Sequence, residues 1–258
     1  MEVRGRSGGI RRPVMQERII IALLAVLAMG AWIVTIQQAR ANSMGMGATM
    51  GMSGPLFLGV WVVMMVAMMF PSAAPMIVLF SRLAHARRGR GQAFVPTWVF
   101  VIGYLAVWAA SGIAFYAAAV TIQSLAGDSG WIAENGARIT GVLFVAAGAY
   151  QLSPFKSACL SKCRSPFDFI LKSWRDGYGG AIQMGVQHGL FCLGCCWLLF
   201  AILFPLGIMS VPAMAVLAVL ILGEKTLPQG MLLARGLGIA LFAYGLGIIV
   251  APHLLVHA

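Results

Sequence analysis

Long apolar runs separated by short polar connections occupy most of the chain. A helix needs about 20 predominantly apolar residues to cross a bilayer. The pattern predicts spanning helices at Ile19–Ile36, Leu56–Phe80, Phe94–Ile122, Ile139–Ser153, Ala181–Phe204, Leu206–Leu222 and Met231–Val250. The sixth has the weakest pattern, because it is short, Pro212 interrupts it, and only Pro205 separates it from the fifth. We therefore expect an all-α protein, a polytopic transmembrane helix bundle of about seven spans.

The basic residues predict how this bundle is oriented. Of the 18 Lys and Arg residues, all but Arg40 and Arg138 lie on one side of the predicted bundle. They are in the tail 1–18, in the connections that follow the second, fourth and sixth predicted spans, or just beyond those connections. Cytoplasmic loops are enriched in Lys and Arg. The sequence therefore predicts a cytoplasmic N-terminus, an external C-terminus and a multi-pass protein of the cell (inner) membrane.

The first apolar run has a second interpretation. Basic residues, an apolar stretch and the run Ala39-Arg40-Ala41 resemble a signal peptide with its cleavage site. The stretch is longer than the usual apolar region of such a peptide, and the later charges fit an uncleaved anchor equally well. We favour the anchor.

Composition agrees with a membrane protein. The chain is 60% hydrophobic and 10% charged, with a mean hydropathy of +0.90, whereas soluble domains carry about 25% charged residues. The net charge of +11 follows from the basic connections, so we expect a lipid bilayer and no nucleic acid as partner. The predicted organisation is a basic tail (1–18) and a single transmembrane domain (19–258), with a Met-rich outer loop (42–54) and a basic cytoplasmic loop (155–180).

The basic loop 155–180 alternates charged residues with large apolar ones. Phe167, Phe169, Ile170, Leu171 and Trp174 lie among Lys and Arg residues. Such a segment is typical of an interfacial helix resting on lipid headgroups. A surface that docks a partner protein is the alternative.

Methionines gather in the predicted outer loop and in the second span. In the loop, Met44, Met46, Met50 and Met52 alternate with small residues. Thioether sulfur is a soft ligand that selects Cu(I), although a loop grazing the membrane could also use Met as an adaptable apolar filler.

The second span carries a ladder of four methionines, Met64, Met65, Met68 and Met69. Residues four apart share a helix face, so Met64 stacks on Met68 and Met65 on Met69. Core packing alone explains any one of them. Pro71 and Pro75 are expected to bend or break this helix locally, and broken helices at membrane depth mark binding sites.

The fifth span has the most chemical character. Met184, His188, Cys192 and then Cys195 or Cys196 follow one another at helical spacing and form one stripe. An imidazole inside hydrocarbon marks a functional site by default, and the His-x3-Cys-x2-Cys spacing brings one imidazole and two thiolates within reach of one ion. A satisfied interhelical His beside inert Cys is the structural alternative. Counting residues from either face puts this stripe and the ladder at a similar depth.

Two further cysteines, Cys159 and Cys163, follow the fourth span on the cytoplasmic side. If this stretch is helical, their side chains share a face and could chelate a soft metal. Lys162 and Arg164 are expected to lower the thiol pKa. A dithiol redox pair is the competing use, and the placement of all five cysteines argues against an extracellular disulfide framework.

Several function classes lack their signatures. No carboxylate is expected within the spans, since Glu224 stands at a boundary, so a proton-coupled transporter built on buried acids is not predicted. No Walker loop, phosphorylated-aspartate motif or dinucleotide-binding glycine motif is visible. The pattern assigns no catalytic residue and no enzymatic reaction.

Three runs carry a resemblance to a known family: Met64–Ser72, Lys156–Pro166 and Gly185–Trp197. In them the chain resembles a bacterial and archaeal family of predicted metal-binding integral membrane proteins, a domain of unknown function. The resemblance covers most of the chain from the second span onward and implies a metal site. Eukaryotic high-affinity copper transporters offer a looser similarity, because they also combine external Met motifs with a Met-x3-Met pair in a membrane helix.

The sequence thus favours a membrane protein that binds a soft metal, Cu(I) or another, for transport or for delivery to a partner such as a metallochaperone or a membrane cuproenzyme. The outer methionines would capture the ion, the second and fifth spans would hold it, and Cys159 and Cys163 would exchange it with the cytoplasm. A membrane thiol-disulfide oxidoreductase and an accessory subunit of a membrane complex are the alternatives.

Overall fold

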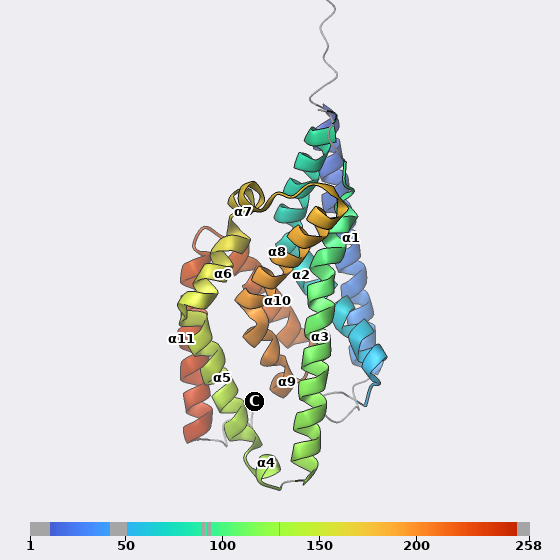
Figure 1. The fold of residues 1–258 in the computed structure, drawn as a ribbon. Helices are drawn as coiled ribbons and strands as arrows, with labels where there is room; N and C mark the ends of the chain where they lie inside the picture. The colour runs from blue at the N-terminus through green and yellow to red at the C-terminus, as the bar shows by residue number, and fades with distance from the viewer. Residues whose placement is uncertain (1–10, 42–50, 89–90, 92–93, 129, 252–258) are drawn as a thin grey trace, which may run out of the picture.

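The computed structural model describes residues 11–41, 51–88, 91, 94–128 and 130–251. These residues form helices and no strand, which confirms the predicted all-α class. Figure 1 labels the helices α1 (Arg11–Ala41), α2 (Gly54–Arg88), α3 (Thr97–Asp128), α4 (Gly130–Glu134), α5 (Gly136–Leu152), α6 (Pro154–Arg164), α7 (Pro166–Ser173), α8 (Gly177–Ala201), α9 (Leu203–Leu206), α10 (Val211–Thr226) and α11 (Gly230–Val250).

Five of these helices are long and apolar enough to cross a membrane. They are α2, α8, α11 and the segments Met15–Ala41 of α1 and Thr97–Leu125 of α3. The predicted fourth and sixth spans correspond to α5 and α10, which have 17 and 16 residues. The described residues therefore give five helices of full spanning length where the sequence predicts about seven spans.

Large apolar side chains lie exposed on the outside of the bundle, and three charged ones, Lys156, Glu224 and Lys225, are buried within the described part of it. On α1, Leu23, Val26 and Met29 are more than half exposed. Lys156 and Glu224, in contrast, are each 1% exposed. This distribution is the reverse of that in a water-soluble protein and is expected of a helix bundle surrounded by lipid.

Three prolines were expected to disturb helices. α2 continues from Gly54 to Arg88 with Pro71 and Pro75 inside it, so of the two expected outcomes, a bend or a break, the break does not occur. Pro212 does not interrupt a helix, because it lies in the first turn of α10. In the first turn the missing proline N–H has no intrahelical partner to lose, and the interruption instead falls at Gly207, between α9 and α10.

Glycines allow two helix pairs to approach closely. A Cβ atom on Gly185 of α8 would lie 2.1 Å from the carbonyl oxygen of Phe100 in α3. A Cβ atom on Gly148 of α5 would lie 2.5 Å from the backbone nitrogen of Phe242 in α11. Small residues at such crossings are what membrane helices use to bring their backbones together. Figure 1 shows the α5–α11 pair on one side of the molecule and α1, α2 and α3 on the other.

Replacing Gly185 with Ala is expected to destabilise the protein by about 1–3 kcal/mol, the usual cost of overpacking. The added methyl meets a backbone carbonyl of α3, so the two helices must separate. Gly59→Ala is the matched control, because nothing lies within 4 Å of its Cβ position. Thermal unfolding in detergent measures both. A Gly185→Ala variant as stable as Gly59→Ala would contradict the close approach.

The bundle has two distinct ends. At the first, which we call the basic end, α1 begins, α2 finishes, and α6 and α7 lie across the helices (Figure 1). α4, α9 and the start of α2 lie toward the opposite end. In α7, Phe169 and Ile170 are buried, whereas Phe167 and Leu171 are largely exposed. The predicted amphipathic loop thus forms two short helices, α6 and α7, with apolar side chains on both faces of α7.

Candidate soft-metal centre

Three cysteines of α8 lie in the core of the bundle. Cys192, Cys195 and Cys196 are each 1% exposed. The thiols of Cys195 and Cys196 donate hydrogen bonds to the carbonyl oxygen of Cys192, at 3.1 and 2.9 Å. Met184 and His188, the other members of the predicted stripe, are buried as well. The stripe therefore faces the interior along its whole length.

Helix α6 brings the remaining two cysteines to the same place. The sulfur of Cys159 lies 2.9 Å from the position that a Cβ atom would take on Gly194 of α8. The thiol of Cys163 interacts with Cys192 and Cys195. The structure describes all five cysteines as free thiols. We call Cys159, Cys163, Cys192, Cys195 and Cys196 the cysteine cluster; the sequence treated them as two separate groups, and the structure brings the two groups together.

The expected lowering of the thiol pKa on α6 is wrong. Burial raises the pKa of the Cys159 thiol, and its interactions with Cys192 and Cys195 raise that of Cys163. The basic neighbours are engaged elsewhere. Lys162 lies 4.0 Å from the carboxylate of Asp168, and Arg164 donates to the backbone carbonyls of Glu224 and Pro228. Their charges therefore do not favour thiolate at Cys159 or Cys163.

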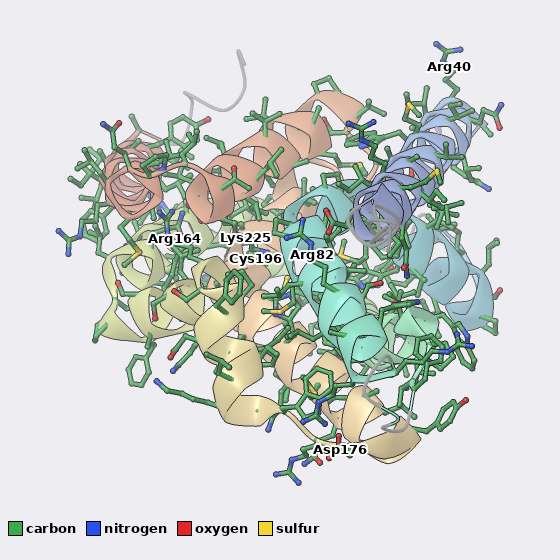
Figure 2. The ribbon with its side chains drawn as sticks, turned by 90° about the horizontal axis from the view of Figure 1, so that it is seen from above. Arg40, Arg82, Arg164, Asp176, Cys196 and Lys225 are labelled. Carbon is green, nitrogen blue, oxygen red and sulfur yellow. The ribbon has the colours of Figure 1, made fainter. Side chains whose placement is uncertain are left out.

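A buried lysine supplies positive charge to the cluster instead. The ammonium group of Lys225, at the end of α10, lies 2.9 Å from the sulfur of Cys192 and 3.3 Å from the hydroxyl oxygen of Ser72. Lys225 is 8% exposed, although the sequence placed it in a cytoplasmic connection. Figure 2 shows Lys225 beside Cys196 in the middle of the bundle, whereas Arg40 and Asp176 lie at its rim. A buried ammonium is stable only with partners, and the sulfur of Cys192 is the nearest.

The preceding residue, Glu224, forms a second buried network on the other side of α10. Its carboxylate accepts hydrogen bonds from Lys156 of α6 at 2.7 Å and from Gln151 of α5 at 2.9 Å. The carboxyl and ammonium groups of this ion pair are each 1% exposed. Glu224, which the sequence places at the boundary of a span, is therefore buried among the helices. Through this ion pair α10 holds α6, and with it Cys159 and Cys163, against α8.

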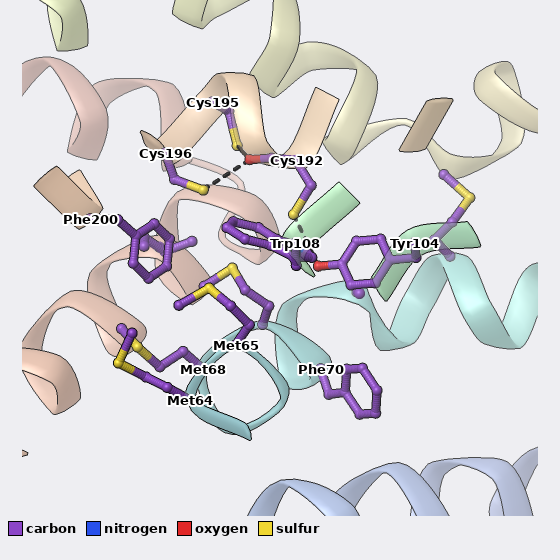
Figure 3. Packing of buried hydrophobic residues seen from close by; sticks show 14 of the residues in the cluster. Met64, Met65, Met68, Phe70, Tyr104, Trp108, Cys192, Cys195, Cys196 and Phe200 are labelled. Carbon is purple, nitrogen blue, oxygen red and sulfur yellow. Dashed lines mark hydrogen bonds between the residues drawn. The ribbon is translucent and has the colours of Figure 1, made fainter. Parts of the chain in front are cut away.

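The methionine ladder of α2 lies on the opposite side of Lys225 from α6. Met64, Met65, Met68 and Met69 are each at most 1% exposed. The sulfur of Met69 lies 4.0 Å from the Lys225 ammonium nitrogen. Figure 3 shows Met65 on the side of α2 toward the three cysteines of α8, near Trp108, whereas Met64 and Met68 extend from another side of α2. Lys225 thus joins the ladder to the cysteine cluster, two elements that the sequence placed only at a similar depth.

Aromatic rings enclose His188. Its imidazole stacks on Tyr104 and Phe100, with ring centroids 5.6 and 6.1 Å apart, and Phe169 meets it edge-on. Its Nδ1 atom is buried and has no hydrogen-bond partner. The hydroxyl of Tyr104 lies 3.1 Å from the sulfur of Cys192. An unpaired buried nitrogen one helical turn from Cys192 is available as a ligand or as the partner of a water molecule.

The donor set of this region suits a soft ion. Thiols and thioethers surround Lys225, and such ligands select Cu(I) among the biological metals. In their present rotamers, no three His, Cys, Asp or Glu side chains of the described residues are arranged to hold a metal together. The thiols of Cys195 and Cys196 point at a backbone carbonyl, so rotation about their Cα–Cβ bonds is what would bring them to an ion. Cu(I) can also be held by two sulfur ligands alone.

The outer-loop methionines have different positions. Met44, Met46 and Met50 lie outside the described residues. Met52 is 8% exposed and packs in the core at the start of α2. It lies at the end of the bundle away from α6 and α7, and of the four it is the one that the structure describes.

Sequence reasoning missed Lys225, Tyr104, Ser72 and the Lys156–Glu224 pair. A Glu-Lys dipeptide at the end of an apolar run was the available signal. It was interpreted as a boundary because charged residues usually stand at the membrane surface. Nothing in the local pattern shows that both side chains turn inward, one toward α8 and the other toward α6.

A protein-family model described as PpoB2: Copper chaperone matches residues 58–248. The match covers all four methionines of the ladder, the five cysteines, His188 and Lys225. No curated protein and no solved structure matches the chain.

Proposed function

The chain belongs to this family of copper chaperones, and from that premise we propose that it binds Cu(I) within the membrane and passes it to a partner protein. The observation that carries the proposal is a buried ammonium group in contact with the Cys192 thiol and the Met69 thioether, in a core that holds three buried and two half-buried free thiols and four buried thioethers. Thiolate and thioether sulfur bind Cu(I) in preference to the harder divalent ions.

Cys192 and its neighbours on α8 and α6 are the proposed final ligands. Two thiolates and one Cu(I) ion together carry a charge of −1, which is costly inside a low-dielectric bundle. The Lys225 ammonium, 2.9 Å from the Cys192 sulfur, balances that charge. Binding releases the thiol protons, since the thiolate is the ligand. If the side chain of Cys195 or Cys196 rotates away from the Cys192 carbonyl oxygen, its sulfur becomes available as a second ligand for the same ion.

We propose further that α5 and α10 cross the membrane, giving seven spans with the basic end in the cytoplasm. A helix of 17 residues is about 26 Å long at 1.5 Å per residue, close to the ~30 Å hydrocarbon core. α5 packs along α11 through glycines. Val142 of α5 and Val219 of α10 are more than half exposed, as lipid-facing residues are. Cys159 and Cys163 then lie on the cytoplasmic side of the cluster, where a soluble or membrane-bound acceptor can reach them.

The decisive experiment compares copper content in the wild type and in a Cys192→Ala, Cys195→Ala, Cys196→Ala variant. Both are purified without oxygen and loaded with Cu(I) under competition from a chelator. We expect close to one copper per wild-type chain and a loss of at least tenfold in the variant. Copper–sulfur scattering in X-ray absorption identifies the ligands, and thermal unfolding checks that the variant is folded.

Other results would overturn the proposal. If neither protein retains copper while the variant remains folded, the cluster is not a copper site. Alkylation before and after mild oxidation then tests the thiol-disulfide alternative, which predicts a reversible disulfide between Cys163 and a cysteine of α8. Thiols that stay reduced and bind no copper would leave a packing role.

A further inference from the structure

Three methionines from three separate segments line one small cavity far from α6. They are Met52, which precedes α2, Met64 of α2 and Met209 of the α9–α10 connection. The other lining residues are Phe57, Val60, Trp61 and Ile208. Met64 is also the first member of the α2 ladder, so the cavity lies where the ladder begins. We call it the methionine pocket.

The walls of the methionine pocket are held in place. Trp61 donates its indole N–H to the carbonyl of Trp108 at 3.0 Å, and its ring stacks on Phe57 with centroids 6.0 Å apart. Gly207, with φ 90°, ends α9, and the N–H of Ser210 closes the turn on its carbonyl at 2.8 Å. Gly207 therefore fixes the turn that carries Met209. These contacts hold Trp61 and the turn of Met209 in place, so the cavity lined by the three methionines is preformed.

Size and chemistry restrict what the pocket can hold. The volume within which the centre of a water-sized sphere can move is about 10 Å³. This is close to the minimum that one water molecule requires. Water would need two to four polar partners there, and the lining side chains have no free polar group, because the Trp61 N–H is already donated. A hard cation would find no oxygen ligand. A soft monovalent cation would find thioether sulfur, which needs no deprotonation.

We propose that the methionine pocket is a second binding site for Cu(I), built from thioethers alone. The inference rests on the proposed function, because it assigns the place where the ion is held before it reaches the cysteines. Residues four apart on a helix are separated by about 6 Å along its axis. From Met64 the ion meets Met68 one turn further, and Met69 contacts Lys225, which contacts Cys192.

The order of affinities follows from charge. Thioethers are neutral, so they hold the cation less tightly than thiolates do. An ion bound weakly at the pocket can leave for the cluster, where its bond to thioether sulfur is replaced by a bond to a cysteine sulfur that releases its proton to water, and copper stays Cu(I). Binding strong enough to admit the ion and weak enough to release it is what a pathway requires.

Four proteins test this: the wild type, Met209→Leu, the Cys192/Cys195/Cys196→Ala variant, and the combination of the two. Met→Leu nearly conserves volume, and Met29→Leu, at an exposed position on α1, is the matched control. Each protein is titrated with Cu(I) against a weak chelator, and loading of the thiols is followed by stopped-flow mixing.

The cysteine variant should keep one weaker Cu(I) site, which the combined variant should lose by at least tenfold in affinity. Met209→Leu alone should keep the tight thiol site of the wild type, lose the weaker site, and load the thiols several-fold more slowly. If the two cysteine variants bind alike and Met209→Leu loads like Met29→Leu, there is no pocket site, while the cluster proposal stands. If the wild type retains no more copper than the cysteine variant, the proposed function itself fails.

Discussion

Replacing Lys156 with Met is expected to destabilise the protein by about 3–5 kcal/mol, the usual cost of removing one partner from a buried ion pair. The change leaves the Glu224 carboxylate buried, 1% exposed, with Gln151 as its remaining hydrogen-bond partner and without its ion-pair partner. The cost appears as a lower unfolding temperature in detergent. Copper retention should also fall, because the pair holds α6 and its two cysteines against α8.

Two further variants make this prediction specific. Lys172→Met removes a lysine whose ion pair with Asp168 is exposed, and exposed pairs contribute about 1 kcal/mol or less. The double variant Lys156→Met, Glu224→Leu should regain much of the lost stability, since no unpaired charge remains. A Lys156→Met protein as stable as Lys172→Met would show that the buried pair does not support the fold.

Much of the fold follows from apolar periodicity alone. The five long helices each coincide with a predicted span because a run of about 20 apolar residues has few other solutions in lipid. The errors concern the places where the sequence predicted helices to be interrupted. Pro71 and Pro75 remain inside α2, and the break between α9 and α10 falls at Gly207, because helix packing on both sides decides which interruptions are tolerated. Local pattern carries no information about those neighbours.

The sequence predicted most of the sulfur-containing residues of the candidate site, but not how the helices bring them together. Helical spacing places Met184, His188, Cys192 and Cys196 on one stripe, and the structure buries that stripe. The meeting of α6 with α8 is a contact between distant segments, and single-sequence spacing cannot show it. For the same reason Lys225 was assigned to a loop. Its inward position depends on Ser72 and Cys192, which lie 153 and 33 residues away.

Together these contacts give each element at the basic end a separate task. In the proposed metal centre, α8 and α6 supply the cysteines, Lys225 of α10 places a positive charge beside them, and Glu224 of α10 forms an ion pair with α6. The adjacent residues Glu224 and Lys225 would then connect stability with metal binding. Their effects are separable, because the Glu224 network faces α6 and the Lys225 network faces α2 and α8.

Replacing Lys225 with Met is expected to change which metal the cluster prefers. With the ammonium in place, two thiolates and Cu(I) form a neutral group, whereas two thiolates and Zn²⁺ leave a net charge of +1. At an effective dielectric constant of about 20, unit charges 4 Å apart interact by roughly 4 kcal/mol. Losing part of that interaction should weaken Cu(I) binding by about a hundredfold, at 1.4 kcal/mol for each factor of ten. Zn²⁺ retention should rise, because its neutral complex no longer faces a buried cation.

Competition titrations with Cu(I) and Zn²⁺ on the same preparations measure this reversal directly. Lys172→Met is again the control, since it removes an equal charge from the surface, where solvent screens it. Met at position 225 preserves an apolar stem of similar length, so a folded variant is expected, and thermal unfolding verifies it. If the affinities for Cu(I) and Zn²⁺ fall together, Lys225 only positions the residues of the cysteine cluster and does not select the metal by its charge. Unchanged Cu(I) affinity would mean that the charge of the bound ion is balanced elsewhere, and the ammonium beside Cys192 would have no part in selecting a monovalent metal.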